Sequence, residues 1–129
     1  YDPRLIKNIV PGDAYNHVAM KRLFGVPDDF DWNRDAVPPE VEERIRECGP
    51  ITHLAPDAPP VLAKYRNAHE VDGQIHHPNF GRYLQKAMAG VGGECLFRVY
   101  TEETEYSDGP DGFFREFMQF LRKHLLPFP

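Results

Sequence analysis

The hydrophobic pattern in the second half of the chain predicts two strands joined by a helix. Residues 61–65 and 95–100 are short apolar runs of the length of buried strands. Between them, apolar residues recur at the i, i+4, i+7, i+8 and i+11 spacing of a helix face; these are Phe80, Leu84, Ala87, Met88 and Val91. Because a strand, a crossover helix and a second strand form a βαβ unit, the two strands are predicted to be parallel.

A further helix is predicted after the second strand. Residues 101–112 are polar and acidic and are expected to form a loop, and Asp111 is a suitable N-cap for a helix that reaches about Leu125. The apolar residues of this helix form an aromatic stripe that we expect to face the core: Phe113, Phe114, Phe117, Phe120, Leu121 and Leu125. The second half of the chain is therefore predicted to have the order β-α-β-α, an α/β fold.

The first half of the chain predicts helices within irregular segments. Residues 1–12 alternate weakly between apolar and polar and are expected to form an extended arm. A helix is predicted over residues 14–24, capped by Asp13 and stopped by Gly25. A shorter helix is predicted over residues 39–48, where Pro39 suits the first position.

The acidic segment between these helices and the glutamates of the second one have structural explanations. Phe30 and Trp32 are expected to anchor the acidic loop of residues 27–38 to the body of the protein. Glu40, Glu42 and Glu43 lie in the first turn of the second helix, where the helix dipole favours negative charge. We interpret them as a solvated face rather than a cation site.

Length and composition restrict the class of protein. A chain of 129 residues suits one domain, and a net charge of -5 argues against a nucleic-acid or anionic-membrane partner. The apolar runs are far shorter than the roughly 20 residues that span a bilayer, so no membrane span is expected. Cys48 and Cys95 have no metal-binding spacing and are expected to be unlinked thiols. No cofactor is predicted.

The loop after the first predicted strand holds the densest cluster of chemically active side chains: His69, Glu70, Asp72, His76 and His77. In open α/β sheets, ligands bind at the carboxyl ends of the strands, which is where this loop lies. His69, His76 and His77 are therefore candidate ligand-binding residues.

Two other interpretations of this loop remain open. Imidazole and carboxylate ligands within nine residues suit a zinc-like site. His69-Glu70 would begin an H-E-x-x-H motif, but the position of its second histidine is occupied by Gly73, and the stretch is a loop. The favoured structural explanation is that His76 or His77 caps or packs against the helix that Pro78 opens, while the other is partly exposed.

Two groups of segments carry a resemblance to a known family. The first group leads into the first predicted strand and comprises Gly49-Pro50-Ile51-Thr52-His53-Leu54 and Pro59-Pro60-Val61-Leu62. The second group covers the crossover helix and the start of the second strand and comprises Ile75-His76-His77-Pro78, Phe80-Gly81, residues 84–92 and Glu94-Cys95. Together they resemble the carboxy-terminal portion of an α/β-hydrolase of the esterase/lipase type, of a bacterial esterase-like branch.

This resemblance implies a partial α/β-hydrolase fold that forms one domain in all. Residues 1–57 would be a cap-like excursion and linker, and residues 58–129 the carboxy-terminal β-α-β-α part of the sheet. The implied substrate is a small ester or carbohydrate ester. A sheet of two parallel strands is narrower than usual. We therefore expect the edge of the strand at residues 61–65 to be completed by another chain or by an N-terminal half of the same protein.

The resemblance also implies a catalytic triad, most of which this chain does not supply. Such enzymes need a serine on a G-x-S-x-G elbow, an acid after the penultimate strand and a histidine after the last strand. The elbow is absent, Ser107 is the only serine, and residues 101–112 contain no histidine. Glu70 and Asp72 are the candidates for the acid, displaced by one and three positions from the place where the family carries it. The chain alone is therefore not expected to hydrolyse esters.

Three functions follow from these observations. The first is the carboxy-terminal segment of an esterase/lipase-like hydrolase. The second is a non-catalytic hydrolase-fold module for binding or structure, which the missing histidine favours. The third and weakest is a metal-binding protein that uses the loop of residues 69–77.

Overall fold

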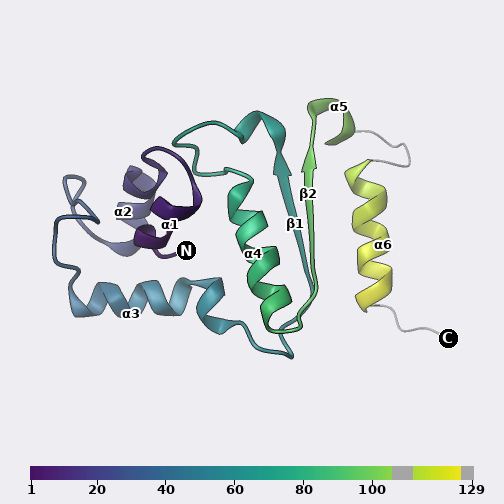
Figure 1. The fold of residues 1–129 in the computed structure, drawn as a ribbon, viewed down its shortest axis with the longest axis horizontal. Helices are drawn as coiled ribbons and strands as arrows, with labels where there is room; N and C mark the ends of the chain where they lie inside the picture. Colours follow the sequence, from purple (N-terminus) through teal and green to yellow (C-terminus); the bar gives the residue numbers. More distant parts are fainter. Residues whose placement is uncertain (106–111, 126–129) are drawn as a thin grey trace.

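The computed structural model describes residues 1–105 and 112–125 and has a mixed α/β fold (Figure 1). The described residues contain six α-helices and a two-stranded sheet. In chain order these are α1 (Pro3–Ile9), α2 (Val18–Phe24), α3 (Pro39–Cys48), β1 (Val61–Arg66), α4 (Asn79–Gly90), β2 (Cys95–Tyr100), α5 (Glu102–Glu105) and α6 (Phe113–Leu125). Short 3-10 turns lie at Ala14–Asn16, Pro50–His53 and Asn67–His69.

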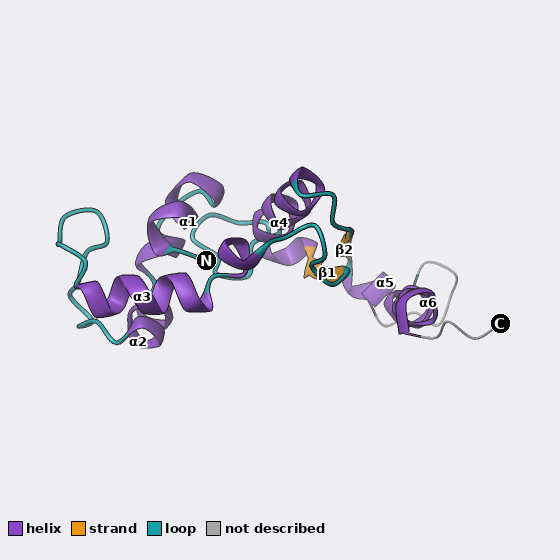
Figure 2. Cartoon of the chain, turned by 90° about the horizontal axis from the view of Figure 1, so that it is seen from below, coloured by secondary structure: helices purple, strands orange, loops and turns teal. Residues whose placement is uncertain are grey.

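The sheet confirms the predicted βαβ unit. β1 pairs with β2 in parallel, from Val61 opposite Cys95 to Arg66 opposite Tyr100. Seen along the strands, α4 covers one face of the sheet and α6 covers the other (Figure 2). Strand side chains alternate between the faces, so odd-numbered residues of both strands point toward α4 and even-numbered ones toward α6.

α4 packs closely on its face of the sheet because a glycine stands at the contact. A Cβ on Gly81 would lie 2.5 Å from Cδ2 of Phe97 and closer still to the ring of Tyr65. These two rings lie 5.9 Å apart, and Met88, further along α4, is fully buried. Gly92 follows the end of α4 with φ +78°, a backbone conformation that favours glycine.

α6 contacts the other face through polar groups and through the ring of Phe113, which lies 5.5 Å from the ring of Tyr100. Arg98 Nε donates to Glu116 Oε1 at 2.5 Å, and the hydroxyl of Tyr100 donates to the same carboxylate. The Lys64 ammonium lies 4.2 Å from the ring centroid of Phe113, within the range of a cation–π contact.

The prediction that the whole aromatic stripe of α6 faces the core is wrong. No residue of the described helix is fully buried, and Phe114 and Leu125 are 64% and 67% exposed. The apolar arc of α6 is wider than the surface that two strands offer, so part of it is left uncovered. Asp111, the predicted cap of this helix, lies outside the described residues.

The predicted extended arm at the amino-terminal end is also wrong, because residues of this segment form α1. Asp2 is its N-cap and accepts the backbone N–H of Arg4 at 2.8 Å, and Pro3 occupies the first helical position. A capping aspartate followed by proline is a strong helix start that outweighs weak alternation.

Two other local predictions need adjustment. The helix predicted over residues 14–24 is a 3-10 turn followed by α2, because His17 is extended and its Nδ1 caps Ala19 N–H at 3.1 Å. The stop at Gly25 is confirmed, with φ +71°. The segment after β2, predicted as a loop, begins with the short helix α5.

Two apolar cores hold the first half of the chain. One joins α2, α3 and the loop between them and contains Phe24, Val26, Trp32, Val41 and Ile45. The expected anchoring by Trp32 is therefore confirmed. The other contains Ile6, Val10, Ala14 and Phe80 and fixes α1 against α4, on the side of α4 that faces away from the sheet (Figure 1).

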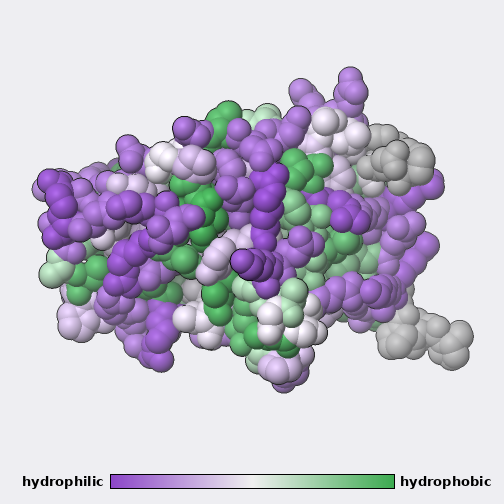
Figure 3. All heavy atoms as spheres, viewed as in Figure 1, coloured by the Kyte–Doolittle hydropathy of each residue, from purple (hydrophilic) through white to green (hydrophobic). Residues whose placement is uncertain are grey.

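The surface is mixed in character. On the face shown in Figure 3, hydrophobic atoms reach the surface in patches near the middle, whereas the outer margin of α6 is hydrophilic. Among the described helices, none has the length and apolar character needed to cross a bilayer.

Candidate functional site

A small cavity lies where the strands end, and we call it the strand-end pocket. Its volume is about 200 Å³, and it is lined by Lys64, Tyr65, Arg66, His69, His76 and Glu105. The first three belong to the end of β1, the histidines to the loop after it, and Glu105 to α5. This is the carboxyl end of a parallel sheet, where α/β proteins bind their ligands.

The loop that carries the histidines is held by the amino-terminal part of the chain. Gly73 N–H donates to the carbonyl of Pro11 at 2.7 Å. Gly12 and Gly73 both have positive φ, at +78° and +75°, and a Cβ on Gly12 would lie 2.8 Å from Gly73 N. The two glycines therefore allow two turns to meet backbone to backbone, and this contact fixes the path of the loop.

Two partly exposed cations around one buried carboxylate form one wall of the strand-end pocket. The Glu105 carboxylate pairs with both the Lys64 ammonium and the Arg66 guanidinium, and its side chain is only 6% exposed. The hydrogen bond from Lys64, followed by that from Arg66, lowers the pKa of Glu105 despite the opposing effect of desolvation. The carboxylate is therefore ionised at neutral pH.

His69 and His76 form the opposite part of the lining. Their ring centroids are 5.7 Å apart, with the ring planes inclined at 39°. Within the described part of the chain, neither imidazole has a hydrogen-bond partner, so both keep a donor and an acceptor for another molecule.

The two candidate acids do not line this pocket. Glu70 forms an ion pair with Arg82 of α4 at 2.7 Å, and this contact lowers its pKa. Asp72 is exposed and lies against Gly12. The loop thus directs both carboxylates away from the histidines that were grouped with them in the sequence.

His77 has a structural place rather than a place in the pocket. It is buried at 4% exposure, and its Nδ1 accepts the backbone N–H of Asn79 at 3.1 Å, at the start of α4. His76 is exposed. This agrees with the structural explanation favoured from the sequence, because His77 caps the helix and His76 is exposed.

The geometry does not favour the metal-binding alternative. Across residues 1–105 and 112–125, no three histidine, cysteine, aspartate or glutamate side chains converge in a way that could hold a metal ion. Cys48 and Cys95 are both free thiols. His69 and His76 alone would give two ligands, whereas a zinc site uses three or four protein ligands.

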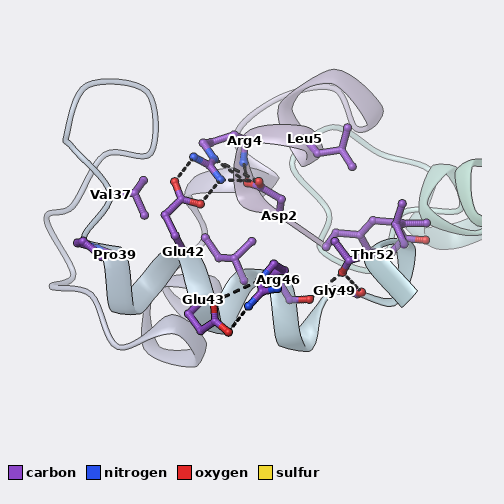
Figure 4. Close-up of a pocket in the computed structure, with 13 residues that line it drawn as sticks. Asp2, Arg4, Leu5, Val37, Pro39, Glu42, Glu43, Arg46, Gly49 and Thr52 are labelled. Atoms are coloured by element: carbon purple, nitrogen blue, oxygen red, sulfur yellow. Dashed lines mark hydrogen bonds and ion pairs between the residues drawn. The ribbon is translucent and has the colours of Figure 1, made fainter. Parts of the chain in front are cut away.

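A larger cavity, which was not predicted from the sequence, lies between α1 and α3 (Figure 4). Its volume of about 740 Å³ is within the range of small-molecule sites. Leu5, Val37 and Ile45 contribute apolar walls, and Arg4 joins its two sides by donating to Glu42 at 2.6 and 2.9 Å.

The charged groups at this larger cavity are paired with one another. Arg4 also contacts Asp2, and Arg46 pairs with Glu43 within α3 (Figure 4). Thr52 Oγ1 donates to the carbonyl of Arg46 at 2.7 Å. With these groups already engaged, the cavity offers apolar surface but few polar groups to orient a ligand, so the strand-end pocket is the stronger candidate for chemistry.

Four residues that line the strand-end pocket were not predicted from the sequence, namely Lys64, Tyr65, Arg66 and Glu105. The period-2 alternation of a strand places Lys64 and Arg66 on one face, and this signal was present in the sequence. Nothing local identifies Glu105, because it reaches the pocket only through the parallel pairing of β2 with β1.

The described residues provide no histidine in the position of a triad base. His124 of α6 lies 3.5 Å from Glu94, which precedes β2, so it is at the opposite end of the sheet from the strand-end pocket. Ser107 lies outside the described residues. No family model, no curated protein and no solved structure matches the chain.

Proposed function

We propose that this chain is the carboxy-terminal segment of an esterase/lipase-like α/β-hydrolase and contributes the last two strands of a wider parallel sheet. The observation that carries the proposal is the apolar stripe of α6, exposed at Phe114 and Leu125, on the side of the open edge of β1. A carboxylic ester hydrolase, acting on a small ester or carbohydrate ester, is the activity that the sequence resemblance implies for the whole protein.

The position of the stripe follows from helix geometry. Phe114, Met118, Leu121 and Leu125 share one side of α6, at i, i+4, i+7 and i+11. The opposite side carries Glu116 and Lys123, which bond to Arg98 in β2 and to Glu94 just before it. Since the charged side is over β2, the apolar stripe lies on the side of β1.

A further parallel strand beside β1 accounts for both features. It would satisfy the unpaired backbone groups along that edge, and its side chains with their covering helix would bury the stripe. Parallel sheets are normally wider than two strands and are covered on both faces, as this sheet already is by α4 and α6.

Comparison of one substitution in two contexts tests this arrangement. In the full-length gene product, Phe114→Asp should lower the free energy of unfolding by about 2–3 kcal/mol, because a large buried side chain becomes charged. In the 129-residue chain alone the loss should stay within about 0.5 kcal/mol, since this residue is exposed there. Gln119→Asp, on the polar side of α6, is the control and should be nearly neutral in both. Equal effects of Phe114→Asp in both contexts would contradict the wider sheet.

Ester hydrolysis is tested separately. We expect the full-length gene product to hydrolyse p-nitrophenyl acetate or butyrate, and an organophosphonate probe to label a serine outside this chain. The 129-residue chain should hydrolyse neither ester, because it has no nucleophile elbow.

A non-catalytic hydrolase-fold module is the second candidate. The placement of His124 at the wrong end of the sheet, together with the lack of histidine over residues 101–112, favours it. This alternative would be established by two results together. Phe114→Asp would destabilise the full-length product more than the 129-residue chain, and the folded full-length product would neither hydrolyse the esters nor react with the probe.

A further inference from the structure

The cavity of about 740 Å³ lies between two helices that belong to different apolar cores. α1 packs into one core through Ile6 and Val10, and this core continues to α4. α3 packs into the other core through Val41 and Ile45, together with α2 and the loop between them. Because each helix is held from a different side, their facing sides do not close on each other, and a cavity remains between them.

Apolar side chains form most of the walls of this cavity. Leu5 is contributed by α1, Val37 by the loop before α3 and Ile51 by the 3-10 turn after α3, and all three are half-buried. Ile45 of α3 lines the same space. A ligand that covers these side chains removes their apolar surface from water, which is the main favourable contribution to binding in a cavity of this kind.

The charged side chains of the lining bind one another. Arg4 donates to both oxygens of Asp2 and to both oxygens of Glu42 (Figure 4). Arg46 donates to both oxygens of Glu43. Among the described residues that line the cavity, three carboxylates and two guanidinium groups leave one negative charge in excess. An anion is therefore repelled, and a cation has to share carboxylate oxygens that already accept hydrogen bonds.

We propose that this cavity binds a neutral, largely apolar small molecule of two or three rings. The apolar walls provide the affinity, and the paired charges select against an ionised ligand. The ion pair of Arg4 with Glu42 also connects α1 with α3, so the cavity is formed before a ligand arrives. Binding at this place is separate from the strand-end pocket and from ester hydrolysis, so the proposal goes beyond the proposed function and is tested independently of it.

Two fluorescent probes with the same ring system test the selection against charge. N-phenyl-1-naphthylamine is neutral, and 8-anilinonaphthalene-1-sulfonate adds one sulfonate group to it. Both are titrated into the 129-residue chain with its α-amino group acetylated, because Tyr1 lines the cavity and an ammonium there would attract the sulfonate. We expect saturable binding of the neutral probe and a dissociation constant at least about tenfold higher for the sulfonate. No saturable binding of the neutral probe, or equally tight binding of the sulfonate, would overturn the proposal.

Substitutions locate the bound neutral probe. Ile51→Glu places a carboxylate in the apolar wall and should weaken binding at least about tenfold, because the probe would strip water from that charge. Val71→Glu is the matched control, since Val71 is 54% exposed and lies outside the cavity. Phe114→Asp removes an exposed apolar side chain of α6 and should also leave binding unchanged. If Phe114→Asp abolishes binding and Ile51→Glu does not, the probe binds at α6 and the proposal is wrong.

A direct map of the bound probe covers the case in which Ile51→Glu does not fold, as judged by circular dichroism. Backbone amide shifts of the ¹⁵N-labelled, acetylated chain are followed by NMR during titration with N-phenyl-1-naphthylamine. We expect saturable changes concentrated in α1, α3 and residues 50–53. Changes concentrated in α6 or at the strand-end pocket would contradict the proposal.

A substitution in the ion pairs tests the charge argument with the opposite sign. Glu42→Gln removes the excess negative charge of the lining and one anionic partner of Arg4, so the sulfonate probe should bind at least about threefold more tightly, while binding of the neutral probe stays unchanged. Glu47→Gln changes the net charge equally on the same helix, at an exposed position outside the cavity, and should affect neither probe. Equal strengthening by both substitutions would show that the net charge of the chain, rather than this cavity, controls binding of the sulfonate, and would contradict the proposal.

Discussion

On one face of the sheet, α4 brings Gly81 against the rings of Tyr65 and Phe97 and buries Met88 completely. On the other face, α6 is held by the contacts of Glu116 with Arg98 and Tyr100 and by the ring of Phe113, and it leaves part of its apolar surface in water. The first interface is close-packed and complete within this chain. The second has polar contacts on its β2 side and an unfilled apolar side next to β1.

This difference indicates where the fold is self-sufficient. A close-packed interface loses stability when any atom is removed or added, because neighbours cannot relax into the change. A partly exposed interface responds weakly to the same substitutions, since water already occupies the space. The predictions below compare the two faces by this criterion.

The largest expected effect is a difference in lost stability between two methionine substitutions, one on each face of the sheet. Met88→Ala should lower the free energy of unfolding by about 3 kcal/mol, because it leaves a cavity in the α4 interface. Met118→Ala removes the same atoms from α6, where the residue is only partly buried, and should cost less than about 1 kcal/mol. Urea denaturation of the chain measures both. Similar losses would mean that the two faces are equally packed.

Glycine substitutions in α4 should give the next largest effect. Gly81→Ala places a Cβ against Phe97 and Tyr65 and should destabilise the chain by about 2 kcal/mol. Gly90→Ala is its matched control in the same helix, where a Cβ meets nothing within 4 Å. It should stabilise the chain by about 0.5 kcal/mol, because alanine favours helix. Thermal and urea unfolding should therefore change in opposite directions for the two variants.

The polar contacts of α6 should contribute a smaller amount. Glu116→Ala removes the acceptor of both Arg98 and Tyr100, and we expect a loss of about 1 kcal/mol because the contact is partly open to water. Gln119→Ala, on the exposed side of the same helix, should change stability by no more than about 0.3 kcal/mol. A loss near 3 kcal/mol for Glu116→Ala would show that α6 is as firmly docked as α4.

The smallest expected effect is a dependence on pH. The pKa of Glu105 in the folded chain is lowered from its ordinary 4.5, mainly by its hydrogen bond from Lys64. Its contribution to stability is therefore present above pH 4.5 and is lost as the pH falls through the lowered value. The urea midpoint of the chain should fall more steeply below pH 4.5 than that of Glu105→Gln. Parallel curves would mean that this carboxylate does not stabilise the fold.

The loop of residues 69–77 shows how much of the candidate site could be predicted from the sequence. Its position after the first strand followed from the periodicity of residues 61–65, and the structure places His69 and His76 in a pocket there. Glu70, which the sequence grouped with these histidines, does not line the pocket, because its carboxylate forms an ion pair with Arg82 of α4. Spacing in a loop does not determine side-chain direction, which here depends on the contact of Gly73 with Pro11.

The sequence by itself determined the two strands, the crossover helix and their parallel order, because hydrophobic periodicity and glycine stops act over a few neighbouring residues. Only the tertiary structure decided which charges meet. Lys64 and Arg66 are about forty positions from Glu105, and the parallel pairing of β2 with β1 brings the ends of both strands together. The same pairing leaves one edge of β1 and one side of α6 uncovered, since the width of a sheet is a property of the assembled fold and not of its segments.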